Sequence, residues 1–247
     1  MSKNRAAKAQ QKRMSDIPME NNTINFNQVF KEKSRPVELL PKSLNQERLV
    51  LNLLDPNQDI VIAVGPAGTG KTYLAMQAAI KAFRSGLCDR IILTRPAVGV
   101  EGEQHGFLPG GIIDKMEPWT RPLLDVLREY YHPKTIEQML VDQTIEISPL
   151  AYMRGRTFKN SWIIADEIQN ATPLQVKMLL TRIGVNSKII VTGDIEQADR
   201  VGDQNGLFDL CNRLEQHEVK GISVCKFTDR DIQRHKIITG VLKLYNQ

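Results

Sequence analysis

The chain has 247 residues, of which 41% are hydrophobic and 25% charged, values ordinary for a globular protein with a sizeable core. No apolar run approaches the roughly 18 residues of a membrane-spanning helix, and the basic N-terminus lacks the apolar stretch of a secretory signal. The net charge of +5, with a pI of about 9.1, favours phosphate-rich partners without requiring them.

Three cysteines, Cys88, Cys211 and Cys225, lie far apart in the sequence. Their odd number and wide spacing argue against a disulfide framework or a zinc site and are typical of a reducing cytosol. We therefore expect a cytoplasmic protein in which these thiols are small buried groups. The four histidines likewise show no metal-ligand spacing.

Residues 1–40 are polar, with Asn-rich and Lys-rich stretches, and predict a basic, disordered tail. Residues 41–247 are expected to form a single domain. The tail is either a nucleic-acid-binding arm or a solvated extension, because its charge fits both. The first helix is expected over 38–55, where Leu49, Leu53 and Leu54 share one face.

The segment GPAGTGKT, residues 65–72, matches the phosphate-binding pattern G-x-x-x-x-G-K-[ST]. It follows an apolar strand expected over 59–64 and precedes a helix expected over 72–84, whose positive dipole end would face the phosphates. Lys71 can reach the outer phosphates, and Thr72 can offer its hydroxyl to Mg²⁺. With ATP and Mg²⁺ as cofactors, the expected binding residues are Gly65, Pro66, Ala67, Gly68, Thr69, Gly70, Lys71, Thr72 and Tyr73.

Apolar strands and helical patterns alternate along the rest of the domain. This order predicts a mostly parallel sheet with helices on both faces, and the continuous apolar strands fit burial on both sides. The expected fold is a three-layer α/β P-loop NTPase. Further strands are expected over 90–96, 144–150, 162–167, 188–194 and 222–227, and further helices over 118–131, 173–183 and 206–216.

A long Gly-rich loop is expected over 96–118, leaving the carboxyl end of a strand. Ligands bind at that edge of such sheets, so the loop either contacts phosphate or nucleic acid or is a surface insertion. Residues 227–245 resemble a strand followed by a helix. Arg234 or Arg230 in this segment is a candidate arginine finger, with a solvated basic helix face as the alternative.

Two adjacent acids, Asp166 and Glu167, end the apolar segment WIIADE. Asp166 is placed to approach Mg²⁺, and Glu167 can polarise an attacking water, so the expected reaction converts ATP to ADP and phosphate. A solvated acidic turn is the alternative. Gln197, in TGDIEQADR, is suited to sense the γ-phosphate or the lytic water. Gln46 precedes the first strand and can match the adenine edge, although its spacing alone is a weak signal.

Together these segments resemble the PhoH family of P-loop ATPases, which are related to the first motor domain of superfamily-one helicases. The resemblance covers about Pro41 to Tyr245 and is most specific at GFLPGG and PLAYMRGRTF. The matching segments are SLNQ at 43–46, GPAGTGKT at 65–72, TRPAV at 94–98, GFLPGG at 106–111, PWTRPLLD at 118–125, PLAYMRGRTF at 149–158, DEIQNAT at 166–172, TGDIEQAD at 192–199 and DIQRH at 231–235.

The resemblance implies a RecA-like sheet and roles at the matching positions. It implies an adenine contact for Gln46, a γ-phosphate sensor at Gln197 and a finger at Arg234. It also implies that the protein is an ATPase that forms rings and acts in connection with RNA. The implied nucleic-acid candidates are Thr94, Arg95, Pro96, Arg154 and Arg156, of which the two later arginines are also candidates for nucleotide.

Three functions compete on these grounds. The first is an ATP-driven motor or helicase on single-stranded nucleic acid, with RNA favoured over DNA. Because the chain holds one motor domain, this function predicts a homo-oligomer, most simply a hexameric ring. The second is a nucleotide-dependent switch or assembly ATPase that binds protein partners without moving on nucleic acid. The third is a kinase, which the lack of a recognisable acceptor-binding lid disfavours.

Overall fold

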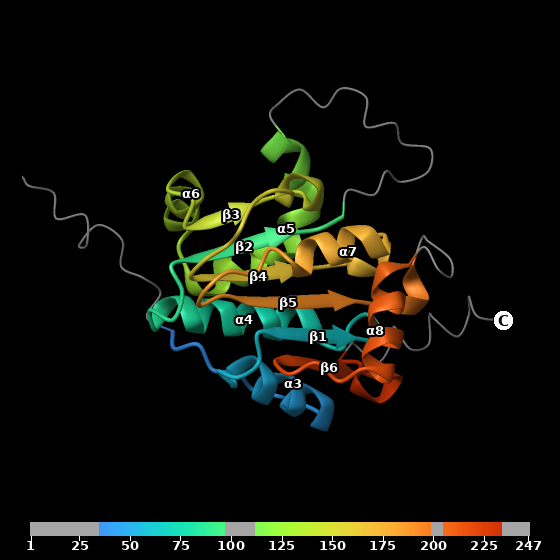
Figure 1. The fold of residues 1–247 in the computed structure, drawn as a ribbon. Coiled ribbons are helices and arrows are strands. Elements are labelled where there is room, and N and C mark those ends of the chain that lie inside the picture. Colours follow the sequence, from blue (N-terminus) through green and yellow to red (C-terminus); the bar gives the residue numbers. More distant parts are fainter. Residues whose placement is uncertain (1–34, 97–111, 199–204, 234–247) are drawn as a thin grey trace, which may run out of the picture. The chain divides into compact units, whose positions relative to one another are not determined.

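The computed structural model describes residues 35–96, 112–198 and 205–233, with the side chains of 112–119 excepted. This part of the chain contains a six-stranded sheet of order β3-β2-β4-β5-β1-β6, and every strand pairing is parallel (Figure 1). The predicted α/β sheet is therefore confirmed. The strands are β1 (Ile60–Val64), β2 (Arg90–Thr94), β3 (Ile145–Ile147), β4 (Ser161–Ala165), β5 (Lys188–Gly193) and β6 (Ile222–Lys226).

Helices cover both faces of the sheet, so the fold has three layers (Figure 1). Alternate residues of each strand point to opposite faces: Val61 and Ala63 join the core beneath α3–α6, whereas Ile60 and Ile62 join the core beneath α7 and α8. The first core is formed with α3 (Leu44–Leu54), α4 (Lys71–Arg84), α5 (Ile112–Tyr130) and α6 (Pro133–Val141), and the second with α7 (Pro173–Leu180) and α8 (Gly206–Gln216).

Two helix predictions need correction, and one helix was missed. Helix α3 begins at Leu44 and not at position 38, because Ser43 caps it by accepting from the Gln46 amide. Helix α5 begins at Ile112, inside the loop predicted over 96–118, although Pro118 suggested a helix start there. Helix α6 was not predicted, and its nine residues start directly at Pro133. None of the helices that the structure describes is long and apolar enough to cross a membrane.

Residues 35–40, which the sequence assigned to the tail, run along the domain without helix or strand. The Arg35 carbonyl accepts from Arg84, and its guanidinium lies 5.9 Å from the centre of the Tyr130 ring. Val37 and Leu39 pack against the core beneath α3–α6. The remaining residues of the predicted tail, 1–34, lie outside the described part of the chain.

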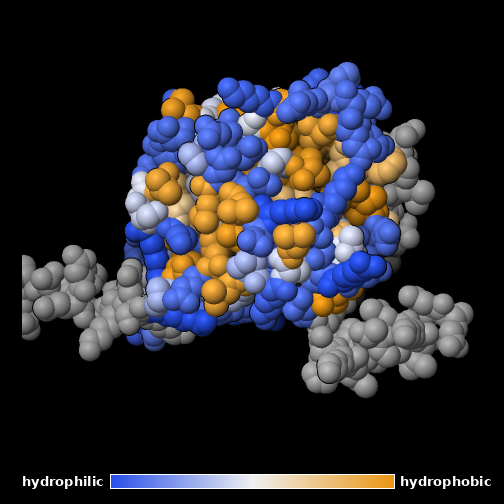
Figure 2. All heavy atoms as spheres, turned by 90° about the horizontal axis from the view of Figure 1, so that it is seen from below, coloured by the Kyte–Doolittle hydropathy of each residue, from blue (hydrophilic) through white to orange (hydrophobic). Residues whose placement is uncertain are grey.

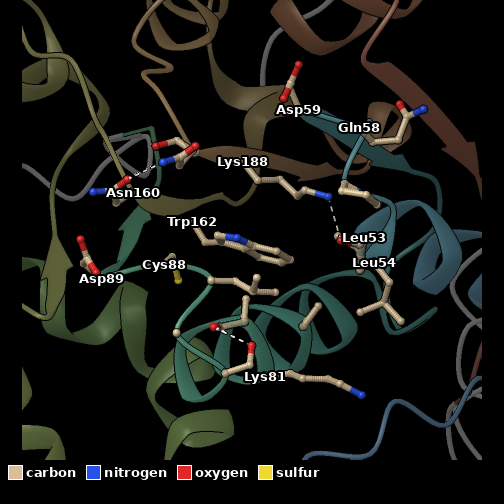
Figure 3. Close-up of a pocket in the computed structure, with 18 residues that line it drawn as sticks. Leu53, Leu54, Gln58, Asp59, Lys81, Cys88, Asp89, Asn160, Trp162 and Lys188 are labelled. Carbon is tan, nitrogen blue, oxygen red and sulfur yellow. Dashed lines mark hydrogen bonds between the residues drawn. The ribbon is translucent and has the colours of Figure 1, made fainter.

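A buried lysine organises the amino-terminal edge of the sheet (Figure 3). Lys188 opens β5 and is 8% exposed, and its Nζ donates to the carbonyls of Leu53 and Asp55, both at 2.8 Å. These carbonyls end α3, where a positive charge also offsets the helix dipole. The ammonium lies 5.3 Å from the Trp162 ring centre, and burial lowers the pKa of Lys188. The lysine therefore fastens α3 to β5 beside a cavity of about 670 Å³.

The buried thiols give a prediction about reactivity. Burial raises the pKa of Cys88 and of Cys211 to about 11, and it also raises that of Cys225. The thiolate is the reactive form, so at pH 8 a thiol with such a pKa is only about 0.1% ionised. Native protein should therefore react with an aromatic disulfide reagent at least about a hundredfold more slowly than protein unfolded in guanidinium, which should release all three thiols. Rapid labelling of the native protein would contradict this burial.

One face of the domain carries exposed leucines. Figure 2 views the side on which α3 and the edge strand β6 lie, and it shows apolar side chains among polar ones. Leu44 and Leu51 are each 62% exposed, Leu54 is 47% exposed, and Leu40 just before the helix is 67% exposed. Clustered exposed apolar groups are typical of interaction surfaces.

Candidate functional site

A polar cavity of about 220 Å³ lies where strands β1, β4 and β5 end. These strands are neighbours in the sheet and parallel, so their carboxyl ends meet at one edge. The cavity therefore joins segments that lie far apart in the sequence. It is lined by Ala67, Gly68, Gly70, Lys71, Thr72, Tyr73, Asp166, Glu167, Gly193, Asp194 and Gln197.

The loop over 65–72 contains glycines with positive φ. Gly65 has a φ of +138°, and a Cβ on it would lie 2.4 Å from the Phe227 carbonyl oxygen. Its amide donates to the carbonyl of Gly193 at the end of β5. Gly70 has a φ of +81° and caps the amino end of α4. A side chain at Gly65 would clash with the backbone, so glycine is what allows the loop to pass between β5 and β6.

Lys71, the first residue of α4, is 7% exposed and folds back over the loop. Its Nζ donates to the carbonyls of Gly65 at 2.6 Å and Pro66 at 2.8 Å, and it lies 3.4 Å from Thr69 Oγ1. An ammonium bound by neutral carbonyls can exchange them for phosphate oxygens, which are negatively charged and therefore stronger acceptors.

Asp166 gathers hydroxyl groups from two other elements. Its Oδ1 accepts from Thr72 Oγ1 at 2.7 Å and from Thr192 Oγ1 at 2.6 Å, and the residue is 3% exposed. Hydroxyl and carboxylate oxygens are hard ligands that suit Mg²⁺, which usually binds one or two carboxylates together with substrate phosphates. The residues present therefore fit a magnesium–nucleotide complex. No group of three or more His, Cys, Asp or Glu residues that could hold a metal ion occurs in the described residues.

Glu167 follows with a left-handed backbone, at φ 57° and ψ 37°. This conformation is unusual for a residue with a side chain and is typical of functional sites. One carboxylate oxygen accepts from the Gln169 amide, and the other lies 3.1 Å from Arg95 Nη2. Its side chain is 44% exposed, so the carboxylate has access to solvent and can receive a proton from water.

The segment after β5 contacts the phosphate-binding loop directly. Asp194 Oδ2 accepts from the backbone amide of Ala67 at 3.1 Å, and its own amide donates to Gln169 Oε1 at 3.1 Å. Gln197 ends the short 3-10 helix Ile195–Gln197, is exposed, and lines the cavity. An amide group in that position can change its hydrogen bonds when the outer phosphate is lost.

Gln46 lies against the phosphate-binding loop from α3. Its Nε2 donates to the Thr69 carbonyl at 2.9 Å, its Oε1 accepts from the Lys42 amide at 2.7 Å, and it is 4% exposed. The structure thus brings Gln46 to the loop, with its amide engaged by the protein. Tyr73 is 39% exposed, and its hydroxyl donates to Glu129 at 2.9 Å. Burial, followed by this hydrogen bond, raises the pKa of Tyr73 to about 12.

The predicted finger segment reaches the same loop. The amide of Gln233 donates to the Gly68 carbonyl at 2.9 Å, and Asp231 accepts from Asn45 of α3 at 2.8 Å. Arg230 is exposed. Arg234 lies outside the described residues, one position beyond this contact.

The candidate nucleic-acid-binding residues differ in their burial and in their contacts. Thr94 and Pro96 are buried, and Arg154 is exposed. Arg156 forms a two-point ion pair with Glu146, and its guanidinium lies 4.5 Å from the Phe158 ring centre. That hydrogen-bonded pair raises the pKa of Arg156, and the side chain fastens β3 to the segment before β4. Neither later arginine lines the cavity, whereas Arg95 contacts its acids.

Sequence reasoning gave no role to Gln169, which is 1% exposed and joins Glu167 to Asp194. The sequence shows that Gln169 lies two residues after the acid pair, but its partner Asp194 is distant in sequence. The pairing of Arg95 with both acids was missed for the same reason, because it depends on the adjacency of β2 and β4.

Comparisons with known proteins find relatives described as PhoH-like. A PhoH-like protein of Synechocystis sp. is 41% identical over 215 residues, which cover 87% of this chain and 65% of that protein. A PhoH-like protein of Mycobacterium tuberculosis is 45% identical over 206 residues, covering 83% of this chain and 57% of that protein. Protein PhoH of Escherichia coli is 40% identical over 193 residues, covering 77% and 54%. The chain thus spans between about half and two thirds of the length of these relatives.

Solved structures match this chain at low sequence identity and with TM-scores below 0.5. The Pif1 helicase from Candida albicans is 16% identical with a TM-score of 0.38, over 83% of this chain and 44% of that chain. The Sulfolobus solfataricus SWI2/SNF2 ATPase core in complex with dsDNA is 12% identical with a TM-score of 0.43, and the match covers 80% of this chain and 47% of that chain. The family model described as PhoH-like protein matches residues 38–246, well over half of the chain. This chain therefore belongs to the PhoH family.

Proposed function

We propose that this protein binds ATP with Mg²⁺ and hydrolyses it to ADP and phosphate. The observation that carries the proposal is the convergence of Lys71, Thr72, Asp166 and Glu167 on one cavity, although they come from two different strand ends. The coupled hydroxyl and carboxylate of Thr72 and Asp166 fit a metal–phosphate complex. The adjacent carboxylate of Glu167 is the group that fits activation of water, as ATP hydrolysis requires.

Each residue has a defined task in this proposal. Lys71 exchanges its carbonyl partners for the outer phosphates, and Thr72 with Asp166 holds Mg²⁺, which would neutralise phosphate charge when bound. Glu167 accepts the proton of the attacking water. Gln197 senses the outer phosphate from the loop after β5. The buried amide of Gln46 donates to the Thr69 carbonyl of the phosphate-binding loop. To contact adenine as proposed, the amide must replace a hydrogen bond to the protein with one to the base.

The proposed partner is single-stranded nucleic acid, with RNA favoured over DNA, and the proposed compartment is the cytoplasm. Support comes from the net charge of +5 and from Arg95, which is 19% exposed beside the acids at the strand ends. Arginine is suited to phosphate because its planar fork donates two parallel hydrogen bonds. The preference for RNA is supported by the family resemblance alone.

A homo-oligomer, most simply a hexameric ring, is part of this proposal. The exposed leucines of α3 support a contact between subunits. Within the chain, the Gln233 amide donates to the Gly68 carbonyl, so the segment that carries the proposed finger begins beside the phosphate-binding loop. Light scattering with ATP and Mg²⁺ should therefore show a species several times the 28.0 kDa of the monomer. A strictly monomeric protein under these conditions would count against the ring.

The steady-state ATPase rate with and without single-stranded RNA or DNA tests the function. A motor that follows phosphates should be stimulated, and the stimulation should fade between low and moderate salt because counterion release drives the binding. The better polymer identifies the substrate. A rate that no polymer changes would contradict the motor and would favour a nucleotide-dependent switch acting on protein partners.

A further inference from the structure

The guanidinium of Arg95 joins both acids at the end of β4. Its Nη2 atom lies 3.2 Å from Asp166 Oδ2 and 3.1 Å from Glu167 Oε1. The geometry follows from the sheet, because Arg95 directly follows β2, and the Asp166 amide donates to the Thr94 carbonyl at 3.0 Å. One nitrogen therefore pairs with two carboxylates to which the proposed function gives different tasks.

Arg95, Asp166 and Glu167 differ in how far their side chains are exposed to solvent. The Asp166 side chain is 4% exposed, that of Arg95 is 19% exposed and that of Glu167 is 44% exposed. A partly buried ion pair is screened less by water and salt than a surface pair. The contact can thus restrain Glu167, while the guanidinium is still within reach of a ligand from solvent.

The oxygen that Arg95 contacts on Asp166 is the one that the hydroxyl groups leave open. Oδ1 accepts from Thr72 and Thr192, whereas Oδ2 faces Arg95. A divalent cation held by Thr72 and Asp166 would share this carboxylate with the guanidinium, and two cations at such range repel each other. Arg95 and the metal–nucleotide complex are therefore expected to oppose each other at Asp166.

We propose that Arg95 is a positioning residue that couples nucleic-acid binding to the ATPase site. In the resting site it holds Asp166 Oδ2 and Glu167 Oε1. A nucleic-acid phosphate offers the guanidinium two oxygens that share one negative charge and can accept two parallel hydrogen bonds. Transfer of Arg95 to that phosphate frees Glu167 to accept a hydrogen bond from water, and it removes the opposing cation from Asp166. This inference rests on the proposed function and specifies how the same site is regulated.

The first test measures metal–nucleotide affinity without turnover. Mn²⁺ and a non-hydrolysable ATP analogue are titrated into the full chain, and free Mn²⁺ is followed by electron paramagnetic resonance. Arg95→Gln should bind the complex about tenfold more tightly than the unaltered protein, because the competing cation is gone. Arg95→Lys keeps the charge and should retain most of the competition. The matched control is Arg90→Gln, an exposed arginine at the other end of β2, which should bind like the unaltered protein.

The second test adds a single-stranded uridine oligomer to the same titration and to an ATPase assay. In the unaltered protein the oligomer should strengthen Mn²⁺–nucleotide binding and raise turnover. In Arg95→Gln, turnover without RNA should rise by about tenfold, and the oligomer should change neither quantity.

The two tests separate failure of the inference from failure of the proposed function. Unchanged or weaker Mn²⁺–nucleotide binding by Arg95→Gln would overturn the competition, whatever RNA does. Full RNA stimulation of that variant would overturn the coupling. If the unaltered protein neither hydrolyses ATP nor responds to any oligomer, the proposed function fails, and the titration without RNA still decides whether Arg95 opposes the metal.

Discussion

Replacing Glu167 by glutamine is expected to leave ATP bound and to slow its turnover by about 10²- to 10⁴-fold, the range that a general base contributes. The amide keeps the shape of the carboxylate and can still accept from Gln169, but it cannot take a proton from water. Asp166, whose Oδ1 holds Thr72, is untouched, so the metal–nucleotide complex should bind at least as well. Binding of a fluorescent ATP analogue and release of phosphate measure the two effects separately.

Asp166→Asn is the matched comparison for this variant. It alters the adjacent acid and should weaken binding of the metal–nucleotide complex as well as turnover, because it removes the charge that faces Thr72. Near-normal turnover of Glu167→Gln would show that another group activates the water.

Replacing Lys71 by alanine is expected to abolish turnover and to weaken nucleotide binding by about a hundredfold or more, since a buried ammonium no longer meets the outer phosphates. The variant should also lose about 1–3 kcal/mol of unfolding free energy, because the carbonyls of Gly65 and Pro66 lose their charged donor. Nucleotide titration and denaturant unfolding measure these effects.

The control for this variant lies on the same helix. Lys81 of α4 is exposed and ten residues further along, so Lys81→Ala should leave nucleotide binding and turnover unchanged. Retention of tight ATP binding by Lys71→Ala would mean that the loop over 65–72 does not hold the phosphates.

Much of the fold was predictable because its signals are local. The apolar strand ending at Val64, the glycine loop and the helix starting at Lys71 are contiguous, and β4, β5 and α8 read equally clearly. The start of α5 was not predictable, since Pro118 resembles a helix start and lies within the helix. The short helix α6 was missed because nine residues give little periodicity.

In the site, too, residues within a local motif could be predicted, whereas contacts between distant segments could not. Lys71, Thr72 and the acid pair follow from motifs, but their partners depend on the order of the strands. Arg95 contacts Asp166 only because β2 lies beside β4, and Gln169 contacts Asp194 only because β4 lies beside β5. Sequence spacing carries no record of that order, so these contacts required the structure.

The proposal that this cavity hydrolyses ATP can be tested by product analysis of ATP turnover with Mg²⁺. We expect ADP and free inorganic phosphate in equal amounts from the unaltered protein, and no phosphate from Lys71→Ala. A phosphorylated small molecule in place of free phosphate, or equal phosphate release by both proteins, would contradict it.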